Sequence, residues 1–194
     1  MVHQLAHFPF ADKPRSFLEM AALVAHTAHA KQTRKDDTTP YFIHPCMVAF
    51  KLMSYGFSDQ VIAAGLVHDV LEDTDFTKEE LEVLVGKPVV EIVLAVSEDK
   101  SLPWEERKAL YIERVAAASD QVKAVSIADK IHNLESLFSA YQIHGEDVWK
   151  FFNRGRELKC WFEQTLCAEV KKTWKHPILD EYTILVERLN ALKG

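Results

Sequence analysis

Helical periodicity recurs along most of the chain, bounded by capping residues, and this pattern limits the fold more than any other feature. Ser16 and Glu19 have the spacing of a capping box, and Thr77 and Glu80 repeat it. No stretch shows the sustained alternation of apolar and polar residues that is typical of strands. The sequence therefore predicts an all-α fold, and it leaves open whether the helices form a bundle or an orthogonal array.

The expected helices follow from these signals. Ser58 is expected to cap the third of them, which carries the polar stretch discussed below, and Gly145 is expected to separate the last long ones. The helices are expected at residues 17–32, 45–55, 59–74, 78–85, 88–97, 104–118, 120–141 and 146–173, with a final one after His176 and Pro177.

Composition predicts one globular domain over residues 1–194, because 48% of the residues are hydrophobic and 27% are charged. No run of about 18 apolar residues suggests a membrane span, and the N-terminus lacks a signal-peptide pattern, so we expect a cytosolic protein. A formal net charge of −6 argues against nucleic-acid binding. A small phosphorylated ligand remains compatible with it if basic residues gather locally, and the oligomeric state stays open.

Residues 62–74 begin as an apolar run and then place four polar groups within six residues: His68, Asp69, Glu72 and Asp73. Ionised carboxylates beside an apolar run are costly to desolvate without a cation or hydrogen-bond donors. These side chains could therefore bind a metal ion or transfer protons. The alternative is an amphipathic helix whose acidic last turn is solvated.

Two distant residues could complete a metal site. His44 precedes a proline at the expected start of a helix, and Asp129 interrupts the apolar run of residues 122–134. A divalent metal needs imidazole nitrogens and carboxylate oxygens from several elements. Taken singly, each residue has a structural alternative: His44 as a helix cap, His68 as a hydrogen-bonded core histidine, and Asp129 as a salt-bridge partner.

Together, His44, the pair His68-Asp69, and Asp129 reproduce the H…HD…D pattern of the HD metallohydrolase superfamily. The flanking sequence resembles the hydrolase domain of RelA/SpoT enzymes, and the resemblance extends over about residues 17–162. It is similar to the single-domain branch, the small alarmone hydrolases, which includes the animal SpoT homologue. The segments that carry the resemblance are residues 34–35, 40–45, 68–74, 99–103, 106–108 and 128–134.

The resemblance implies a single HD-type domain, with helices in residues 146–193 packed on its core, that hydrolyses (p)ppGpp, the alarmone of the stringent response. Its products would be pyrophosphate and GDP or GTP. It also implies one Mn²⁺ ion, and it assigns Glu72 and Asp73 to the attacking water. The ligands that it implies for Mn²⁺ are His44, His68, Asp69 and Asp129.

The basic residues near these motifs provide the counter-charge that a polyanionic nucleotide needs. The resemblance places an Arg-Lys pair near the base and phosphates, and an asparagine at the nucleotide. The expected substrate contacts are Arg34, Lys35, Lys100, Arg107, Lys108 and Asn133. For Lys100, Arg107 and Lys108 the alternative is a solvated surface.

Two other functions remain compatible with the sequence. The same metal chemistry could act on (p)ppApp or on the 2′-phosphate of NADPH, both of which single-domain relatives make plausible. Alternatively, the chain could be an alarmone-binding protein that has kept the fold without turnover.

Overall fold

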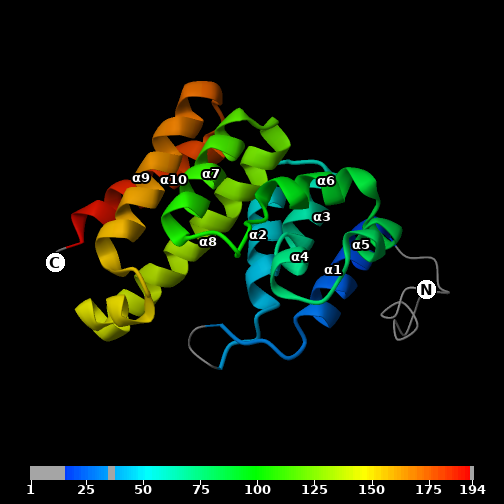
Figure 1. Ribbon diagram of the computed structural model, residues 1–194, viewed down its shortest axis with the longest axis horizontal. Helices are drawn as coiled ribbons and strands as arrows, with labels where there is room; N and C mark the ends of the chain where they lie inside the picture. Colours follow the sequence, from blue (N-terminus) through cyan, green and yellow to red (C-terminus); the bar gives the residue numbers. More distant parts are fainter. Residues whose placement is uncertain (1–15, 35–37, 193–194) are drawn as a thin grey trace. The chain divides into compact units, whose positions relative to one another are not determined.

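The structure is a computed structural model that describes residues 16–34 and 38–192. Its regular elements in this part of the chain are helical, and Thr33 and Pro40 form an isolated β-bridge. The all-α prediction is confirmed. The elements are α1 (Phe17–Ala28), α2 (Ile43–Ser54), α3 (Asp59–Val67), α4 (Val70–Asp73), α5 (Lys78–Val85), α6 (Lys87–Val96), α7 (Trp104–Ala117), α8 (Asp120–His144), the 3₁₀ helix η2 (Gly145–Phe151), α9 (Gly155–Thr173) and α10 (Pro177–Ala191) (Figure 1).

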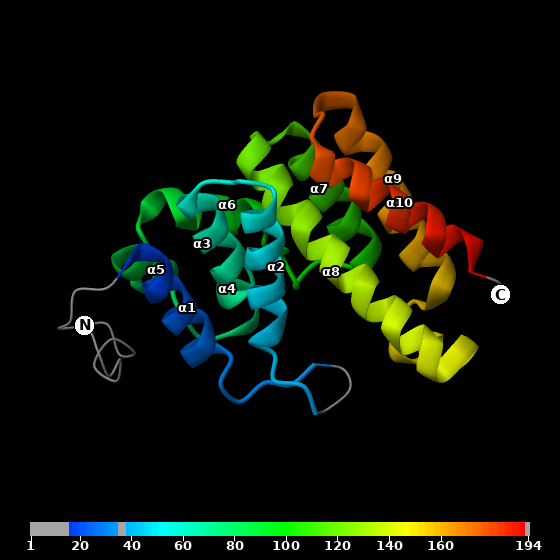
Figure 2. The ribbon, with the colours of Figure 1, turned by 180° about the vertical axis from the view of Figure 1, so that it is seen from behind.

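The chain divides into two compact units, Met1–Glu98 and Asp99–Gly194. In the first unit α3 is the central helix, since α1, α2 and α6 all pack against it. Its residues 61–67 are all buried. Gly65 permits the close approach of α2, because a Cβ there would lie 2.5 Å from Cδ1 of Leu52. Figures 1 and 2 both show α2 beside α3.

Side-chain caps fix several helix starts in this unit. The Ser16 hydroxyl accepts a hydrogen bond from the Glu19 amide, and Thr77 and Glu80 form a reciprocal capping box. The predicted box at Thr77 and Glu80 is confirmed, and at Ser16 and Glu19 the hydrogen bond from the Glu19 amide to the Ser16 hydroxyl is confirmed. Ser58 occupies the N-cap position of α3, but its side chain makes no capping hydrogen bond, so that part of the prediction is wrong.

The expected continuous helix through residues 62–74 is also wrong. Helix α3 ends at Val67, and α4 begins at Val70. Nδ1 of His68 lies 2.8 Å from the carbonyl oxygen of Gly65, which in an unbroken helix would accept from the amide of Asp69. The imidazole therefore takes the place of a backbone donor, and His68 and Asp69 form the junction between two helices.

In the second unit α10 packs on α8 and α9, and α7 packs on α9 (Figure 2). Glu163 is fully buried between α9 and α10, where the Tyr182 hydroxyl donates to it and Lys159 pairs with it. Burial, followed by the neighbouring Glu163, raises the pKa of Tyr182 well above its ordinary value. Tyr111 and Ser126 share a 2.7 Å hydrogen bond that joins α7 to α8.

The long helix expected at residues 146–173 is interrupted. The 3₁₀ helix η2 occupies its first part, and α9 begins only at Gly155. Gly145 and Gly155 have φ angles of 55° and 68°, and an α-helix does not continue through a left-handed residue. Helix α1 likewise ends at Ala28 rather than near residue 32.

The expectation of one domain over residues 1–194 stays a prediction. Among the described residues, no helix has both the length and the apolar character that crossing a membrane requires.

Candidate metal centre

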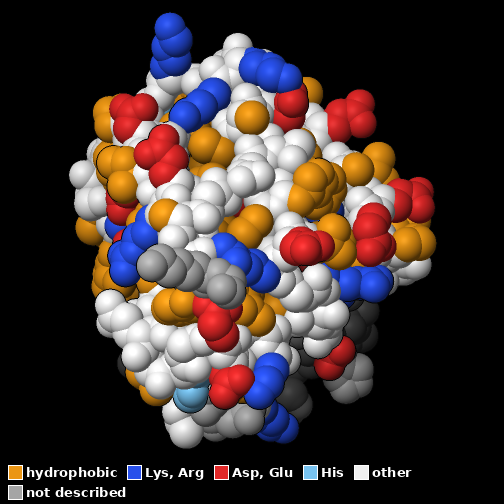
Figure 3. All heavy atoms as spheres, turned by 90° about the vertical axis from the view of Figure 1, so that its left-hand side faces the viewer, with side chains coloured by type: hydrophobic (Ala, Val, Ile, Leu, Met, Phe, Trp, Pro, Cys, Tyr) orange, Lys and Arg blue, Asp and Glu red, His pale blue; other side chains and the backbone are white. Residues whose placement is uncertain are grey.

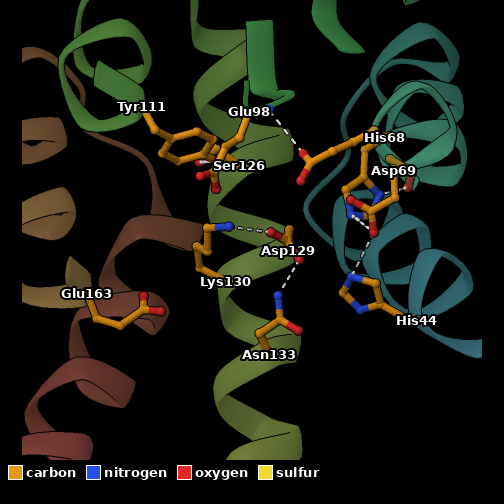
Figure 4. Close-up of polar contacts among 12 residues, drawn as sticks. His44, His68, Asp69, Glu98, Tyr111, Ser126, Asp129, Lys130, Asn133 and Glu163 are labelled. Carbon is orange, nitrogen blue, oxygen red and sulfur yellow. Dashed lines mark hydrogen bonds and ion pairs between the residues drawn. The ribbon is translucent and has the colours of Figure 1, made fainter. Parts of the chain in front are cut away.

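Three potential metal ligands converge in the first unit. Oδ2 of Asp69 lies 3.0 Å from Nε2 of His68 and 3.6 Å from Nε2 of His44. The two imidazole rings meet edge to face, with their centroids 5.1 Å apart. Both histidines are buried, and Figure 4 shows the three side chains pointing toward one another from α2 and from the α3–α4 junction. The structure thus brings together three residues that the sequence predicted as ligands.

The local fold explains this convergence. His44 is the second residue of α2, so the loop before that helix fixes where it enters the site. Its amide donates to the carbonyl of Tyr41 at 2.9 Å, which forms a tight turn after Pro40. The expected place of His44 at the start of a helix is confirmed. His68 and Asp69 are adjacent in sequence and project together because α3 ends immediately before them.

The geometry of His68 requires a positive charge in the site. A carbonyl oxygen only accepts, so Nδ1 of His68 carries the proton in its bond to Gly65. In the neutral ring, Nε2 then presents a lone pair toward the Asp69 carboxylate, 3.0 Å away. Two lone pairs at that distance repel each other unless a proton or a metal ion supplies positive charge. The donor set and the fixed orientation of His68 therefore fit a divalent metal.

Tyr41 and Gln32 add polar contacts that connect the loop before α2 to the two aspartates. The Tyr41 hydroxyl donates to Oδ2 of Asp69 at 2.6 Å and lies 3.5 Å from Oδ2 of Asp73. Gln32 donates from its side-chain amide to the carbonyl of Asp73 at 2.7 Å. The loop before α2 therefore holds the carboxylate of Asp69 and the backbone of Asp73.

Glu72 makes a different contact from its neighbour Asp73. One of its carboxylate oxygens accepts a 3.0 Å hydrogen bond from the amide of Glu98, which orients the side chain. Both expected catalytic carboxylates are half-buried beside the ligand cluster.

In the second unit, Asp129 lies within α8 and is held by two side chains of the same helix. Its Oδ2 accepts from Nζ of Lys130 at 2.7 Å, and its Oδ1 accepts from Nδ2 of Asn133 at 2.6 Å (Figure 4). The salt-bridge alternative considered for Asp129 is thus met by Lys130. Charge-assisted hydrogen bonds on both oxygens fix the orientation of the carboxylate.

The expected substrate contacts fall into several environments. The Arg34 guanidinium lies 5.7 Å from the centre of the Tyr41 ring, and the Lys108 ammonium lies 4.7 Å from the centre of the Phe162 ring. Lys100 is exposed, whereas Arg107 and Asn133 are half-buried. Lys35 lies outside the described residues.

Sequence reasoning did not assign roles to Tyr41, Gln32 or Lys130. Tyr41 stands three residues before His44, inside the segment 40–45 that carries the family resemblance, and this was the signal that could have found it. Lys130 approaches the Tyr111 and Phe162 rings at 5.0 and 5.6 Å, so it shares both aromatic neighbours with Lys108. Only the fold of the second unit reveals that pairing of cations.

Comparison with known proteins shows which family the chain belongs to. A model described as "HD domain" matches residues 21–155, a span that contains every one of the ligand candidates. The chain belongs to the HD-domain family. This confirms the resemblance that the motifs predicted.

Two similar proteins with named activities come from vertebrates. The chain is 44% identical over 121 residues to a guanosine-3′,5′-bis(diphosphate) 3′-pyrophosphohydrolase of Xenopus tropicalis, covering 60% of this chain and 67% of that protein. Its human counterpart of the same name is 42% identical over 121 residues, with the same two coverages of 60% and 67%. The matched region thus spans about two thirds of the length of these relatives.

A solved structure extends the likeness over nearly the whole chain. It is described as a metazoan orthologue of SpoT that hydrolyses ppGpp. The similarity has a TM-score of 0.77 at 30% identity, and it covers 94% of this chain and 100% of the other. The HD-domain member described here therefore shares its helical fold with an animal alarmone hydrolase.

Proposed function

We propose that this protein is a Mn²⁺-dependent 3′-pyrophosphohydrolase of (p)ppGpp. The observation that carries the proposal is the convergence of His44, His68 and Asp69, in a chain whose relatives are named for this reaction. The sequence-based prediction of a ppGpp hydrolase agrees with those names.

The family and the donor set support a divalent metal, and we assign it to His44, His68 and Asp69 of the first unit together with Asp129 of the second. A mixed set of imidazole and carboxylate ligands suits several divalent ions, and we name Mn²⁺ because the family resemblance implies it. When bound, such an ion lowers the pKa of bound water and neutralises phosphate oxygens.

Glu72 and Asp73 are assigned to the attacking water. The Glu98 amide orients Glu72, while Asp73 is tied to the loop before α2 through Gln32 and lies near the Tyr41 hydroxyl. The Glu72 carboxylate, oriented by that amide, can accept a proton from water, and the Asp73 carboxylate lies on the next residue. The water oxygen would form a bond to the phosphorus attached to the ribose 3′-oxygen. The bond between that phosphorus and the 3′-oxygen would break, and the 3′-oxygen would take up a proton. Pyrophosphate and GDP or GTP would result.

Substrate binding is assigned to Arg34, Lys35, Lys100, Arg107, Lys108 and Asn133. Arg34 is supported by its position over the Tyr41 ring, close to the aspartate ligand. Lys108 is supported by its place beside Lys130, because both ammonium groups approach the rings of Tyr111 and Phe162. The Lys108 ammonium can receive a phosphate group as a point charge, whereas the Lys130 ammonium is paired with Asp129. A cytosolic location, as expected from the sequence, fits a soluble nucleotide substrate.

The test is pyrophosphate release from ppGpp by the purified chain, with and without Mn²⁺ after chelation. We expect metal-dependent release that disappears in Asp69→Ala, because that variant removes the carboxylate facing both histidines. Asp75→Ala is the matched control, since it deletes an exposed aspartate of the same unit.

Parallel assays with two further substrates distinguish the alternative functions. Turnover of ppApp or NADPH with ppGpp left intact would keep the metal chemistry and overturn the guanosine assignment. Binding of ppGpp without turnover of any of the three nucleotides would favour a non-catalytic alarmone-binding protein.

A further inference from the structure

The Tyr41 hydroxyl contacts the carboxylate oxygen of Asp69 that also faces His44 and His68. It donates to Oδ2 of Asp69 at 2.6 Å, and the same oxygen lies 3.0 Å from Nε2 of His68 and 3.6 Å from Nε2 of His44. A hydroxyl donor on a ligating carboxylate limits the rotation of that carboxylate and fixes which oxygen faces the histidines.

The ring of Tyr41 is itself held on both sides. It packs on the buried ring of His29 with centroids 4.7 Å apart, and it meets the His44 ring edge to face at 5.8 Å. Its amide donates to the carbonyl of Gln32 at 2.9 Å. Tyr41 is thus fixed by its backbone and by two aromatic neighbours before its hydroxyl reaches Asp69.

The loop that carries Tyr41 is closed by backbone contacts and anchored by Gln32. Thr33 pairs with Pro40 in a β-bridge, and the Arg34 amide donates to the Thr39 carbonyl at 2.8 Å. The Gln32 side chain accepts from Nδ1 of His29 at 2.7 Å and donates to the carbonyl of Asp73 at 2.7 Å. The loop therefore touches both aspartates of the site.

We propose that Tyr41 is a positioning residue for the metal centre, which holds Asp69 in its ligating orientation and links it to the loop that carries Arg34. The inference rests on the proposed function only in taking the metal site to be the same one. The Arg34 guanidinium lies over the Tyr41 ring, and the Tyr41 hydroxyl holds Asp69. A displacement of the loop would therefore move Asp69 through the side chain of Tyr41. Outer hydrogen-bond partners of metal ligands typically change metal affinity by about 10–100-fold when removed.

The test is the affinity of the full chain for Mn²⁺ in the absence of nucleotide, measured by titration calorimetry. Tyr41→Phe removes the hydroxyl and keeps the ring, so its packing on His29 and His44 is retained. We expect Mn²⁺ binding about 10–100-fold weaker than in the unmodified chain. Circular dichroism of the chelated protein should show unchanged helix content.

Tyr141→Phe is the matched control. It deletes a hydroxyl that donates to the exposed Glu146 of the second unit, and it should leave the Mn²⁺ affinity unchanged. A purely structural role of Tyr41 would lower the thermal stability of the chelated protein and leave Mn²⁺ affinity within twofold of the unmodified chain, and that result overturns the inference.

The experiment also separates this inference from the proposed reaction. Weaker Mn²⁺ binding in Tyr41→Phe supports the positioning role even if ppGpp is not the substrate. If the unmodified chain binds no Mn²⁺, the metal assignment fails and the inference fails with it. If the chain hydrolyses ppGpp, saturating Mn²⁺ should restore part of the kcat of Tyr41→Phe, because the variant weakens ligand orientation and retains every ligand.

Discussion

Single atoms decide the geometry of the candidate centre. The carbonyl oxygen of Gly65 fixes the tautomer of His68, and the Tyr41 hydroxyl fixes the carboxylate of Asp69. Both anchors lie outside the set of ligands. They are needed because an imidazole and a carboxylate rotate readily unless a second contact holds each of them.

Gly65 also sets the spacing between α2 and α3. In Gly65→Ala the new methyl would lie 2.5 Å from Cδ1 of Leu52, which is fully buried and has little room to move. We expect the free energy of unfolding to fall by about 1–3 kcal/mol, as in other overpacked cores. Urea denaturation measures this loss.

Leu52→Val provides the control for that substitution, because it removes the colliding methyl. In the Leu52→Val background, the added cost of Gly65→Ala should shrink. Helix propensity alone would make Gly65→Ala stabilising by about 1 kcal/mol, and that outcome would contradict the steric account.

The candidate ligands could be proposed from the sequence because their types and order form a recognisable motif. Tyr41 could not, because its partner Asp69 lies 28 positions away in the sequence. A tyrosine before a histidine indicates no particular hydrogen-bond partner. Lys130 was missed for the same reason, since its aromatic neighbours come from two other helices.

At the scale of elements, caps and breakers determine where the helices begin and end. The caps at Ser16 and Thr77 could be predicted because each capping residue lies three residues from its partner. The break between α3 and α4 could not be predicted, because the helical pattern of apolar residues continues through it. The His68 side chain takes the hydrogen bond to the Gly65 carbonyl that a backbone amide would make in a continuous helix. The 3₁₀ segment η2 was missed because a glycine inside a helical pattern does not by itself show that its φ is positive, as it is at Gly155.

The two N-caps Thr77 and Ser58 form a natural comparison. Both have extended backbone angles, but only the Thr77 hydroxyl accepts a hydrogen bond from its helix. Thr77→Ala should therefore lower the free energy of unfolding by about 1 kcal/mol. Ser58→Ala should change it by less than about 0.5 kcal/mol. Equal losses in the two variants, measured by urea denaturation, would show that the hydroxyl contact is unimportant.

The stability of the fold should depend on pH through His176, the N-cap residue of α10. Nδ1 of His176 accepts from the Ile178 amide at 3.3 Å, and its ring stacks on Trp174. Burial lowers the pKa of His176 below its ordinary value, while Asp120 and Asp180 act in the opposite direction. The unfolded chain therefore binds more protons near pH 6, so stability falls as pH drops below about 6.5.

His176→Asn tests this dependence, because asparagine is a good N-cap that does not titrate. Thermal unfolding between pH 7 and pH 5 should show a larger loss of stability in the unmodified chain than in the variant. Parallel losses in the two proteins would rule out His176 as the source.

For the whole molecule, the net charge of −6 opposes a polyanionic nucleotide, so binding must depend on local cations. On the face in Figure 3, basic and acidic side chains are interspersed with apolar ones. Lys108 and Lys130 instead gather at the rings of Tyr111 and Phe162 within the second unit. The sequence named Lys108 as a candidate contact, and its aromatic neighbours became known only from the structure.

We expect the chain to remove the 3′-diphosphate of ppGpp as one piece. Phosphorus NMR of ppGpp incubated with the full chain and Mn²⁺ tests it most directly, because it identifies every phosphorus-containing product. We predict that pyrophosphate and GDP appear in equal amounts and that neither forms in Asp69→Ala. Release of orthophosphate, or loss of the 5′-diphosphate instead, would contradict the account.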